Sequence, residues 1–438
     1  SSKALSQKII MSAITMKPSN KLLLIGVLLL STLYSYAQQV YPNLKAAQSD
    51  KSLREGMSVT TLGYWKTGDG GGGTYIVSKT GKPNGGDVVK LNNGLIANLL
   101  YDGQTFNLKQ WGISGDVEIR YVKDIYPFLT DSDLKAINPE FNAKTTADTY
   151  ILQYLINNKP NNTIIVLDGK AYYINHTIHL KSFKTIRGTK GFDKDRFGSR
   201  IQLPGKTDVC TYYTNSVLMM IVPDKDMFDS GDNTLQNLQL ENFSAGGVMG
   251  KDGFTKKYSG NFLNQTSVIS NVKFKNLCIS HFASAFYKTK EWIWTTFEEL
   301  DILNMRYNGI YMPSNDKAQA NCNSIRFCRF SKCGVDYDKA GKLHTVSLSR
   351  PAESRGNCIV LGGSGNSVLD CDLSHSPVGL FLQSYSNGTT IVGTYCEGAG
   401  ISTYYMDYDE KSDNLDTEIH GGYISKKVTK KTAKKDFK

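Results

Sequence analysis

The chain has 438 residues, 40% hydrophobic and 21% charged, which is enough apolar material for a large core in one long domain or two. Its 40 glycines and 25 tyrosines, against 11 prolines, favour many turns and strands. The net charge of +11 would suit a nucleic-acid-binding protein, but four lysines lie in residues 1–37 and seven in residues 426–438. The rest of the chain is close to neutral, so nucleic acid is not an expected partner.

The N-terminal segment has the pattern of a signal peptide. From Met16 it reads MKPSNKLLLIGVLLLSTLYSYA, with a basic start, a short apolar run and a small-residue exit. We expect residues 1–37 to be removed after Ala37 and the mature protein to be secreted, periplasmic or on the cell surface. An uncleaved anchor is the alternative, although the apolar run is too short to span a bilayer, and we expect no stable membrane insertion.

Residues 63–77, GYWKTGDGGGGTYIV, raise the question of a phosphate-binding loop. Such a loop needs a lysine and a hydroxyl at the start of a helix that follows the glycines. Here the strand-like residues Thr74 to Val77 follow instead. The stretch therefore predicts a hairpin whose turn requires positive φ.

A repeat begins near residue 235. Apolar or small residues recur at positions i, i+3 and i+5, and successive starts lie about 23 to 43 residues apart, the length of one solenoid coil. The pattern predicts a parallel β-helix over residues 145–425. Earlier coils are indicated by residues 162–189 and by SRIQLPGK at 199–206, and residues 336–357 should leave the coil as a loop. The repeated triplets are Leu235-Leu238-Leu240, Ile269-Val272-Phe274, Phe297-Leu300-Ile302, Ile325-Cys328-Phe330, Val368-Cys371-Leu373, Ile391-Thr394-Cys396 and Ile419-Gly422-Ile424.

The eight cysteines of an exported chain would normally suggest disulfides. However, Cys328 and Cys371 occupy the same slot of successive coils, and Cys333 occupies a slot that is apolar in other coils. We therefore expect stacked interior thiols that act as small hydrophobic residues.

Three segments, at residues 62–77, 106–116 and 145–157, resemble parts of the pectate-lyase-like parallel β-helix superfamily, in particular its phage-tailspike-like branch and exported bacterial relatives. The resemblance implies an all-β, right-handed, single-stranded parallel β-helix with a cap region at 38–116, an insertion or linker at 117–144, coils at 145–425 and a basic tail at 426–438. It also implies structural roles for Asp69 and Asp116, action on a polysaccharide, and a homotrimer. Ala147 departs from the family's usual Asp-Asp-Thr helix start. The segments are LGYWKTGDGGGGTYIV, FNLKQWGISGD and TTADTYILQYLIN.

Stacking of the predicted coils would place outward residues in columns about 4.8 Å apart. The i+4 column combines alternating charges with two tyrosines, and the i+2 column lies beside it. A solvated salt-bridge ladder and a glycan-binding groove both fit this pattern. The i+4 column is Gln239, Lys273, Asp301, Arg329, Asp372, Tyr395 and Tyr423, and the i+2 column is Asn237, Asn271, Glu299, Phe327, Asp370, Gly393 and Gly421.

The resemblance implies a lyase that removes the proton α to a uronate carboxylate. Arg329 would neutralise that carboxylate and Lys273 would act as the base, with His375, Tyr307 and His281 as alternative proton-transfer groups. A bound calcium ion is the other neutraliser, and its candidate ligands are Asp301, Glu299 and Asp372. The candidate sugar-stacking residues are Tyr395, Tyr423, Trp292, Trp294 and Tyr311.

Two further functions stay open at this point. A glycoside hydrolase would use a pair of carboxylates, either Asp301 with Asp372 or Glu299 with Asp370. A non-catalytic glycan-binding or adhesin protein would use the same columns without chemistry, because this fold does not by itself determine function.

Overall fold

The computed structural model describes residues 39–116, 118–189, 199–203, 207–211, 217–220, 225–231, 234–247, 260–346, 350–383, 386–396, 403–406, 418–424 and 426–429. Contacts divide the chain into two units, Ser1–Leu100 and Tyr101–Lys438. The predicted signal peptide lies outside the described residues. Within the described ranges, no helix is long and apolar enough to cross a membrane.

The first unit is a five-stranded sheet with one helix. Its strands run in the order β1-β2-β3-β5-β4, where β1 and β2 are parallel and the other neighbours are antiparallel. The elements are β1 (Gln39–Tyr41), α3 (Leu44–Ser49), β2 (Ser58–Thr61), β3 (Gly73–Ser78), β4 (Val88–Lys90) and β5 (Ile96–Leu99).

The glycine-rich stretch is the connection of a hairpin, as predicted, because it joins the antiparallel pair β2 and β3. The carboxylate of Asp69 organises this connection by accepting hydrogen bonds from the backbone N–H groups of Tyr64, Trp65 and Gly71 at 3.1, 2.8 and 2.8 Å. Gly68 has a φ of +81°, a region that favours glycine. The glycines and Asp69 therefore shape a turn rather than a phosphate site.

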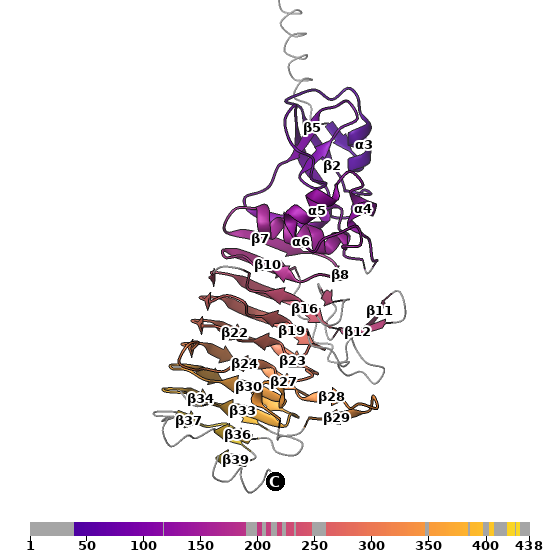
Figure 1. Cartoon of the computed structure of the whole chain (residues 1–438). Coiled ribbons are helices and arrows are strands. Elements are labelled where there is room, and N and C mark those ends of the chain that lie inside the picture. Colours follow the sequence, from indigo (N-terminus) through magenta and orange to yellow (C-terminus); the bar gives the residue numbers. More distant parts are fainter. Residues whose placement is uncertain are drawn as a thin grey trace, which may run out of the picture. The chain divides into compact units, whose positions relative to one another are not determined.

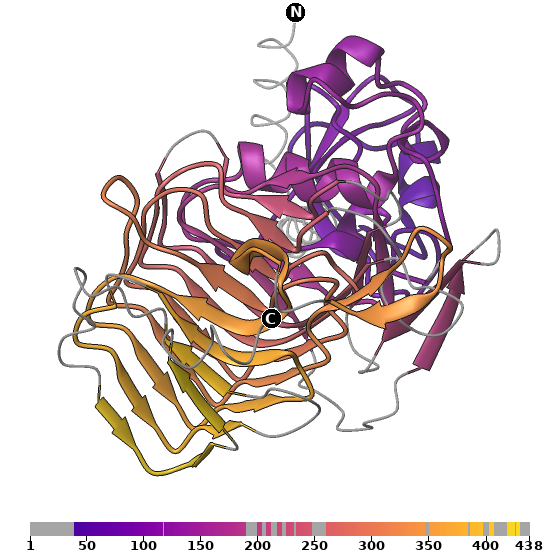
Figure 2. The same cartoon turned by 60° about the horizontal axis from the view of Figure 1, so that its bottom comes forward.

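The second unit is a parallel β-helix (Figures 1 and 2). Its coils form a 17-stranded sheet and a nine-stranded sheet, and some of the coils also contribute to a four-stranded sheet. Its largest sheet carries two faces that meet at a corner. We call them the ladder face and the cavity face, and β16 and β19 contribute to both. The ladder face holds β6 (Thr105–Asn107), β7 (Thr163–Leu167), β10 (Lys184–Gly188), β16 (Gln239–Gly246), β19 (Lys273–Ser280), β22 (Thr296–Glu298), β26 (Ser324–Arg326), β31 (Ser367–Leu369), β34 (Thr390–Val392) and β37 (Glu418–His420).

The cavity face continues the same coils beyond the corner. Its strands are β8 (Ala171–Ile174), β13 (Val217–Met220), β23 (Asp301–Leu303), β27 (Arg329–Ser331), β32 (Asp372–Ser374), β35 (Tyr395–Cys396) and β38 (Tyr423–Ile424). A nine-stranded sheet holds β9 (Ile178–His179), β14 (Phe228–Asp229), β17 (Leu263–Asn264), β20 (Phe286–Tyr287), β24 (Ile310–Met312), β30 (Asn357–Leu361), β33 (Val378–Leu382), β36 (Thr403–Met406) and β39 (Lys426–Thr429). A short sheet holds β15 (Leu235–Gln236), β18 (Ile269–Ser270), β21 (Trp292–Ile293) and β25 (Ala320–Asn321).

The coil register differs from the prediction at one step. Phe297 aligns with Phe274, not with Ile269, and the two buried rings stack at 5.3 Å. The spacing i, i+3, i+5 that starts at Ile269 starts again five residues later at Phe274. The sequence pattern therefore fits two registers, and aromatic packing in the core selects one of them.

Corners between strands are formed by residues in the left-handed backbone region. One column of such corners separates the ladder face from the cavity face, and a second precedes the ladder face. The first column contains Asn242, Asn276, Glu299, Phe327, Asp370, Gly393 and Gly421, and the second contains Asn237, Asn271, Trp294, Cys322, Gly365 and Gly388. The predicted i+2 column combined residues from both of these columns. Its members are therefore corner residues from two different corners of the coil and do not form one stacked column.

The N-terminal end of the coil stack is covered by the predicted cap helix, α6 (Ala147–Asn158). Thr146 caps it by accepting the N–H of Thr149 at 3.3 Å, and its side chains pack onto the first coils. Figure 1 shows the helices around α6 above the first coils. The segment predicted as an insertion or linker packs against α6 through α4 (Val122–Ile125) and α5 (Asp131–Ile137), and η1 (Leu108–Trp111) lies beside them. Asp116 is structural, as predicted, because its carboxylate receives two 2.8 Å hydrogen bonds from Arg120.

Two hairpins leave the coils on the same side in both views (Figures 1 and 2). The predicted loop at 336–357 contains β28 (Val335–Tyr337) and β29 (Leu343–Thr345), an antiparallel pair, followed by η2 (Ala352–Ser354). The prediction that SRIQLPGK begins a coil is wrong, because β11 (Ser199–Leu203) pairs antiparallel with β12 (Thr207–Thr211). At the C-terminal end, β39 pairs with β36, so the coils extend into the segment predicted as a tail.

None of the described cysteines at 278, 322, 328, 333, 358, 371 and 396 forms a disulfide, and all of them except the exposed Cys322 are buried, which confirms the interior thiols predicted at 328, 333 and 371. Cys328, Cys333 and Cys371 are at most 2% exposed. Burial raises the pKa of the Cys328 thiol well above its ordinary value, which keeps it neutral. These cysteines therefore fill the core as small hydrophobic side chains.

A substitution at a corner tests the backbone requirement. Asn276 has a φ of +52° and donates a 2.8 Å hydrogen bond to Asn242 in the preceding coil. We expect Asn276→Ala to lower the free energy of unfolding by about 1–2 kcal/mol more than Asn276→Gly, because only glycine adopts this region without strain. Urea unfolding of both variants measures the difference, and equal losses would show that the hydrogen bond alone matters.

Candidate functional site

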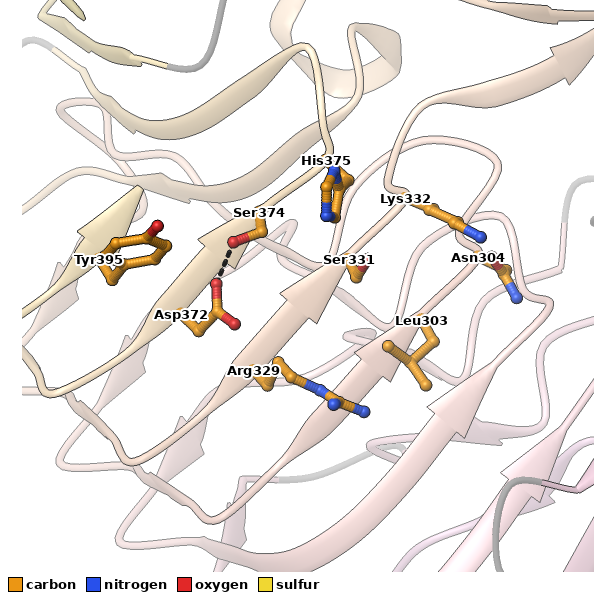
Figure 3. A pocket seen from close by; sticks show the side chains of 9 residues that line it. All are labelled: Leu303, Asn304, Arg329, Ser331, Lys332, Asp372, Ser374, His375 and Tyr395. Atoms are coloured by element: carbon orange, nitrogen blue, oxygen red, sulfur yellow. Dashed lines mark hydrogen bonds between the residues drawn. The ribbon is translucent and has the colours of Figure 1, made fainter. Parts of the chain in front are cut away.

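The cavity face carries a surface cavity of about 330 Å³. It lies over four successive coils, at the ends of β23, β27 and β32 and beside β35 (Figure 3). Four of its residues were candidates from the sequence: Arg329, Asp372, His375 and Tyr395. The full lining is Leu303, Asn304, Arg329, Ser331, Lys332, Asp372, Ser374, His375 and Tyr395.

Register explains why these residues meet. Asp301 lies beside Arg329, Arg329 beside Asp372, and Asp372 beside Tyr395 in neighbouring strands. Tyr423 pairs with Tyr395 through its backbone, and its side chain lies outside what the structure describes. From Asp301 onward, the predicted i+4 column is therefore a true column of the cavity face.

Asp301 and Arg329 form a two-pronged ion pair. Arg329 donates from Nε at 2.8 Å and from Nη2 at 2.6 Å to the two carboxylate oxygens. The Asp301 side chain is 12% exposed and that of Arg329 is 38% exposed, so the carboxylate lies beneath the guanidinium. Such bidentate pairing fixes the orientation of the guanidinium at the cavity.

Asp372 and His375 come from the same coil and both line the cavity, with Asp372 next to Arg329 (Figure 3). The hydroxyl of Ser374 donates a hydrogen bond to the Asp372 carboxylate (Figure 3). His375 is exposed and has a φ of +54°, in a third column of corners that also contains Asn304 and Lys332. A residue in this backbone region at the rim of a cavity is a frequent feature of functional sites.

Lys273 is not part of this cavity. Because the register slips by five residues relative to the prediction, Lys273 lies beside Thr296 on the ladder face, and its Nζ lies 3.2 Å from Glu298. The predicted role of Lys273 as a base next to Asp301 and Arg329 is therefore wrong. His375, the alternative proton-transfer group, lines the cavity instead.

The aromatic residues that were predicted to stack on sugar rings lie in different parts of the β-helix. Trp292 is fully buried in the core and its indole N–H donates to Thr295 at 2.7 Å, so its prediction as a sugar platform is wrong. Trp294 is 62% exposed at a corner, away from the cavity lining. Tyr311 lies on the nine-stranded sheet and stacks on Tyr287 at 5.0 Å. Of the described aromatic candidates, Tyr395 alone lines the cavity, with 39% of its surface exposed.

The other proton-transfer candidates lie apart from the cavity lining. His281 is fully buried and therefore cannot reach a substrate. Tyr307 contacts the guanidinium of Arg306 at 4.7 Å, beside the hairpin of β28 and β29. Neither residue is part of the lining.

The residues present do not fit the expected calcium site. The Asp301 carboxylate is engaged by Arg329, and Glu299 lies at the corner between the two faces, outside the cavity lining. Among the described residues, no three His, Cys, Asp or Glu side chains are placed to hold one ion.

Sequence reasoning missed Lys332, Asn304 and the two serines of the lining. Lys332 and His375 occupy the same slot, i+7, in coils whose triplets start at Ile325 and Val368. Reading that slot as a further outward column would have found both residues together with Asn304.

No family model matches the chain, and no curated protein is similar to it in sequence. Solved structures are similar in fold. A tailspike of Acinetobacter phage vb_AbaP_AS12 has 12% identity and a TM-score of 0.45 over 88% of this chain and 63% of that chain. The tailspike of Acinetobacter baumannii bacteriophage Fri1, described as a capsular polysaccharide depolymerase, has 13% identity and a TM-score of 0.43 over 90% of this chain and 67% of that chain.

Pantoea stewartii WceF, described as a glycan biofilm modifying enzyme with a tailspike-like parallel β-helix fold, has 12% identity and a TM-score of 0.46. The match covers 89% of this chain and 52% of that chain. The chain thus spans between about half and two thirds of the length of these three structures. Identity at this level concerns the fold and does not identify which residues act.

The ladder face offers a pH test. Burial disfavours ionisation of Glu298, but hydrogen bonds from Arg326, Lys275 and Lys273 outweigh it and lower the pKa of this carboxyl to about 2. A lowered pKa stabilises the fold above the unfolded-state pKa of 4.5, and the contribution is lost as the pH falls toward 2. We expect Glu298→Gln to cost about 1–2 kcal/mol at pH 7, since the half-exposed cations screen the full effect. Unfolding free energies measured from pH 7 to pH 2 should converge for the two proteins, and a constant difference would contradict this origin.

Proposed function

We propose that the chain is an exported enzyme that cleaves an acidic polysaccharide by β-elimination at the cavity of the cavity face. One observation supports this most: the cavity lining combines a single carboxylate, Asp372, with the guanidinium of Arg329, the ammonium of Lys332 and the imidazole of His375. Elimination needs positive charge for a uronate carboxylate and one positioned base. The composition of the lining meets both needs.

Each residue has a role in this proposal. Arg329 and Lys332 bind the uronate carboxylate and stabilise the negative charge that develops on it when the adjacent carbon loses its proton. The imidazole of His375 takes that proton, the electron pair forms a carbon–carbon double bond, and the 4-linked oxygen leaves. Tyr395 donates a proton to the leaving oxygen from its phenolic hydroxyl. Asp301 acts as a positioning residue because it holds the guanidinium of Arg329.

A two-carboxylate hydrolase is supported less well. Asp301 and Asp372 lie two coils apart, roughly 10 Å at the backbone, near the upper end of the separation for inversion. However, the Asp301 carboxylate is engaged by Arg329 and does not line the cavity. Glu299 and Asp370 lie at corners outside that lining.

Export would bring the enzyme to its substrate, since capsular and matrix polysaccharides lie outside the cytoplasm. The segment from Met16 to Ala37 supports this part of the proposal by its pattern alone. The homotrimer implied by the family resemblance stays a prediction.

The first variant to test is His375→Ala. We expect it to lower kcat by about 10²–10⁴-fold, because it removes the base, while the fold is retained since the side chain is exposed. Tyr395→Phe should also lower kcat. The measurement is ultraviolet absorbance of unsaturated uronates, with new reducing ends followed in parallel, after incubation with polygalacturonate, alginate and hyaluronate.

The matched control is His344→Ala, which removes a histidine of the hairpin outside the cavity and should leave activity unchanged. Reducing ends without unsaturated product would contradict elimination and favour hydrolysis. Binding without either product would contradict an enzymatic role and favour a glycan-binding protein.

A further inference from the structure

On strands β10 to β26 of the ladder face, the acids are less exposed than the cations that they pair with. Glu241 is paired with Arg187, and Glu298 lies 3.2, 3.2 and 3.1 Å from Lys273, Lys275 and Arg326. The side chains of the two acids are 9% and 12% exposed, whereas those of the four cations are 34–44% exposed. The surface that meets solvent here is therefore cationic, although the residues pair internally.

Two exposed aromatic side chains with unfavourable backbone conformations border this surface. Trp294 and Phe327 are 62% and 56% exposed, so neither gains much from burial. Their φ values are +52° and +56°, a region that costs a bulky residue conformational energy and that asparagine or glycine occupies in several other coils. Backbone strain that is not offset by burial of the side chain suggests a functional role.

The two rings lie at opposite ends of neighbouring strands. Trp294 precedes β22 (Thr296–Glu298), and Phe327 follows β26 (Ser324–Arg326). Because β22 and β26 pair directly, the two rings lie in neighbouring coils. Arg326 lies in the same coil as Phe327, and Lys275 lies in the coil before that of Trp294. Phe327 also occupies the corner that leads from Arg326 on the ladder face to Arg329 on the cavity face.

We propose that Arg187, Lys273, Lys275, Arg326, Trp294 and Phe327 form a second polysaccharide-binding surface, the polyanion strip, which holds an acidic polysaccharide beside the cavity. Half-exposed cations attract the carboxylates of the polymer, and exposed aromatic faces stack on its sugar rings. This inference extends the proposed function by adding a non-catalytic binding surface for the same class of polymer. The strip does not depend on the chemistry at the cavity.

A salt-bridge ladder alone accounts for only part of these observations. Alternation of charge along stacked coils avoids like-charge contacts and explains the ion pairs. It does not explain why the four cations are more exposed than the two acids that they pair with, or why two rings are exposed at strained corners. Charge complementarity therefore favours an anionic polymer over a neutral one.

The test measures binding in a His375→Ala background, so that the polymer is not cleaved. The probes are polygalacturonate, alginate and hyaluronate, with dextran as a neutral polymer, and calorimetry gives Kd at low and high salt. We expect Lys275→Gln with Arg326→Gln to weaken binding at least tenfold at low salt and to flatten its salt dependence. Trp294→Ala should weaken binding about fivefold. Glu298→Gln should tighten binding, because it leaves the cations without their acid.

The matched controls are Trp65→Ala, an exposed tryptophan of the first unit at 49% exposure, and Lys339→Gln in the hairpin turn. Both should bind like the parent, and thermal unfolding verifies that every variant is folded. Strip variants that bind all three polymers like the parent would overturn the strip, as would a parent that binds none of them. If the wild-type protein forms no unsaturated product but the strip variants lose binding, the proposed elimination fails and the strip stands.

Discussion

Parallel hydrogen bonding between successive coils is the constraint on which the other features of this protein depend. Each strand of the β-helix pairs with the equivalent strand of the next coil, so equivalent residues stack about 4.8 Å apart. This register aligns the interior as Leu240, Phe274, Phe297, Ile325, Val368 and Ile391, all at most 1% exposed. A coil cannot bury these side chains alone, so stability comes from the stack.

The same register determines how charge is distributed outside. Each charged side chain lies beside the equivalent residue of the next coil, and two like charges at this spacing repel each other. On strands β10 to β26 of the ladder face, Glu241 is paired with Arg187, and Glu298 is paired with Lys273, Lys275 and Arg326. On the cavity face, one acid, Asp301, holds one arginine, Arg329, and the next acid, Asp372, lies one coil beyond that arginine. The two faces thus present different surfaces from similar residue types.

Several residues of the two proposed functional surfaces occupy left-handed corner positions between strands. Most corner positions are filled by asparagine or glycine, which tolerate the left-handed region. The exceptions are informative, because His375 and Lys332 line the cavity, while Trp294 and Phe327 border the polyanion strip. A coil that places a bulky or ionisable side chain at a strained corner exposes it to solvent on a rigid scaffold, which suits binding and proton transfer.

The sequence by itself determined the repeat, the cap helix, the glycine-rich hairpin and the interior cysteines, because each rests on local spacing or turn chemistry. It also identified the column from Asp301 to Tyr395, since the triplets chosen from Phe297 onward share one register in the structure. Tertiary structure alone decided the alignment of Phe274 with Phe297, the burial of Trp292, the antiparallel hairpin at 199–211 and the meeting of Lys332 with His375. The physical reason is that the apolar spacing occurs twice in one coil, five residues apart, and only the packing of rings in the core distinguishes the two alignments.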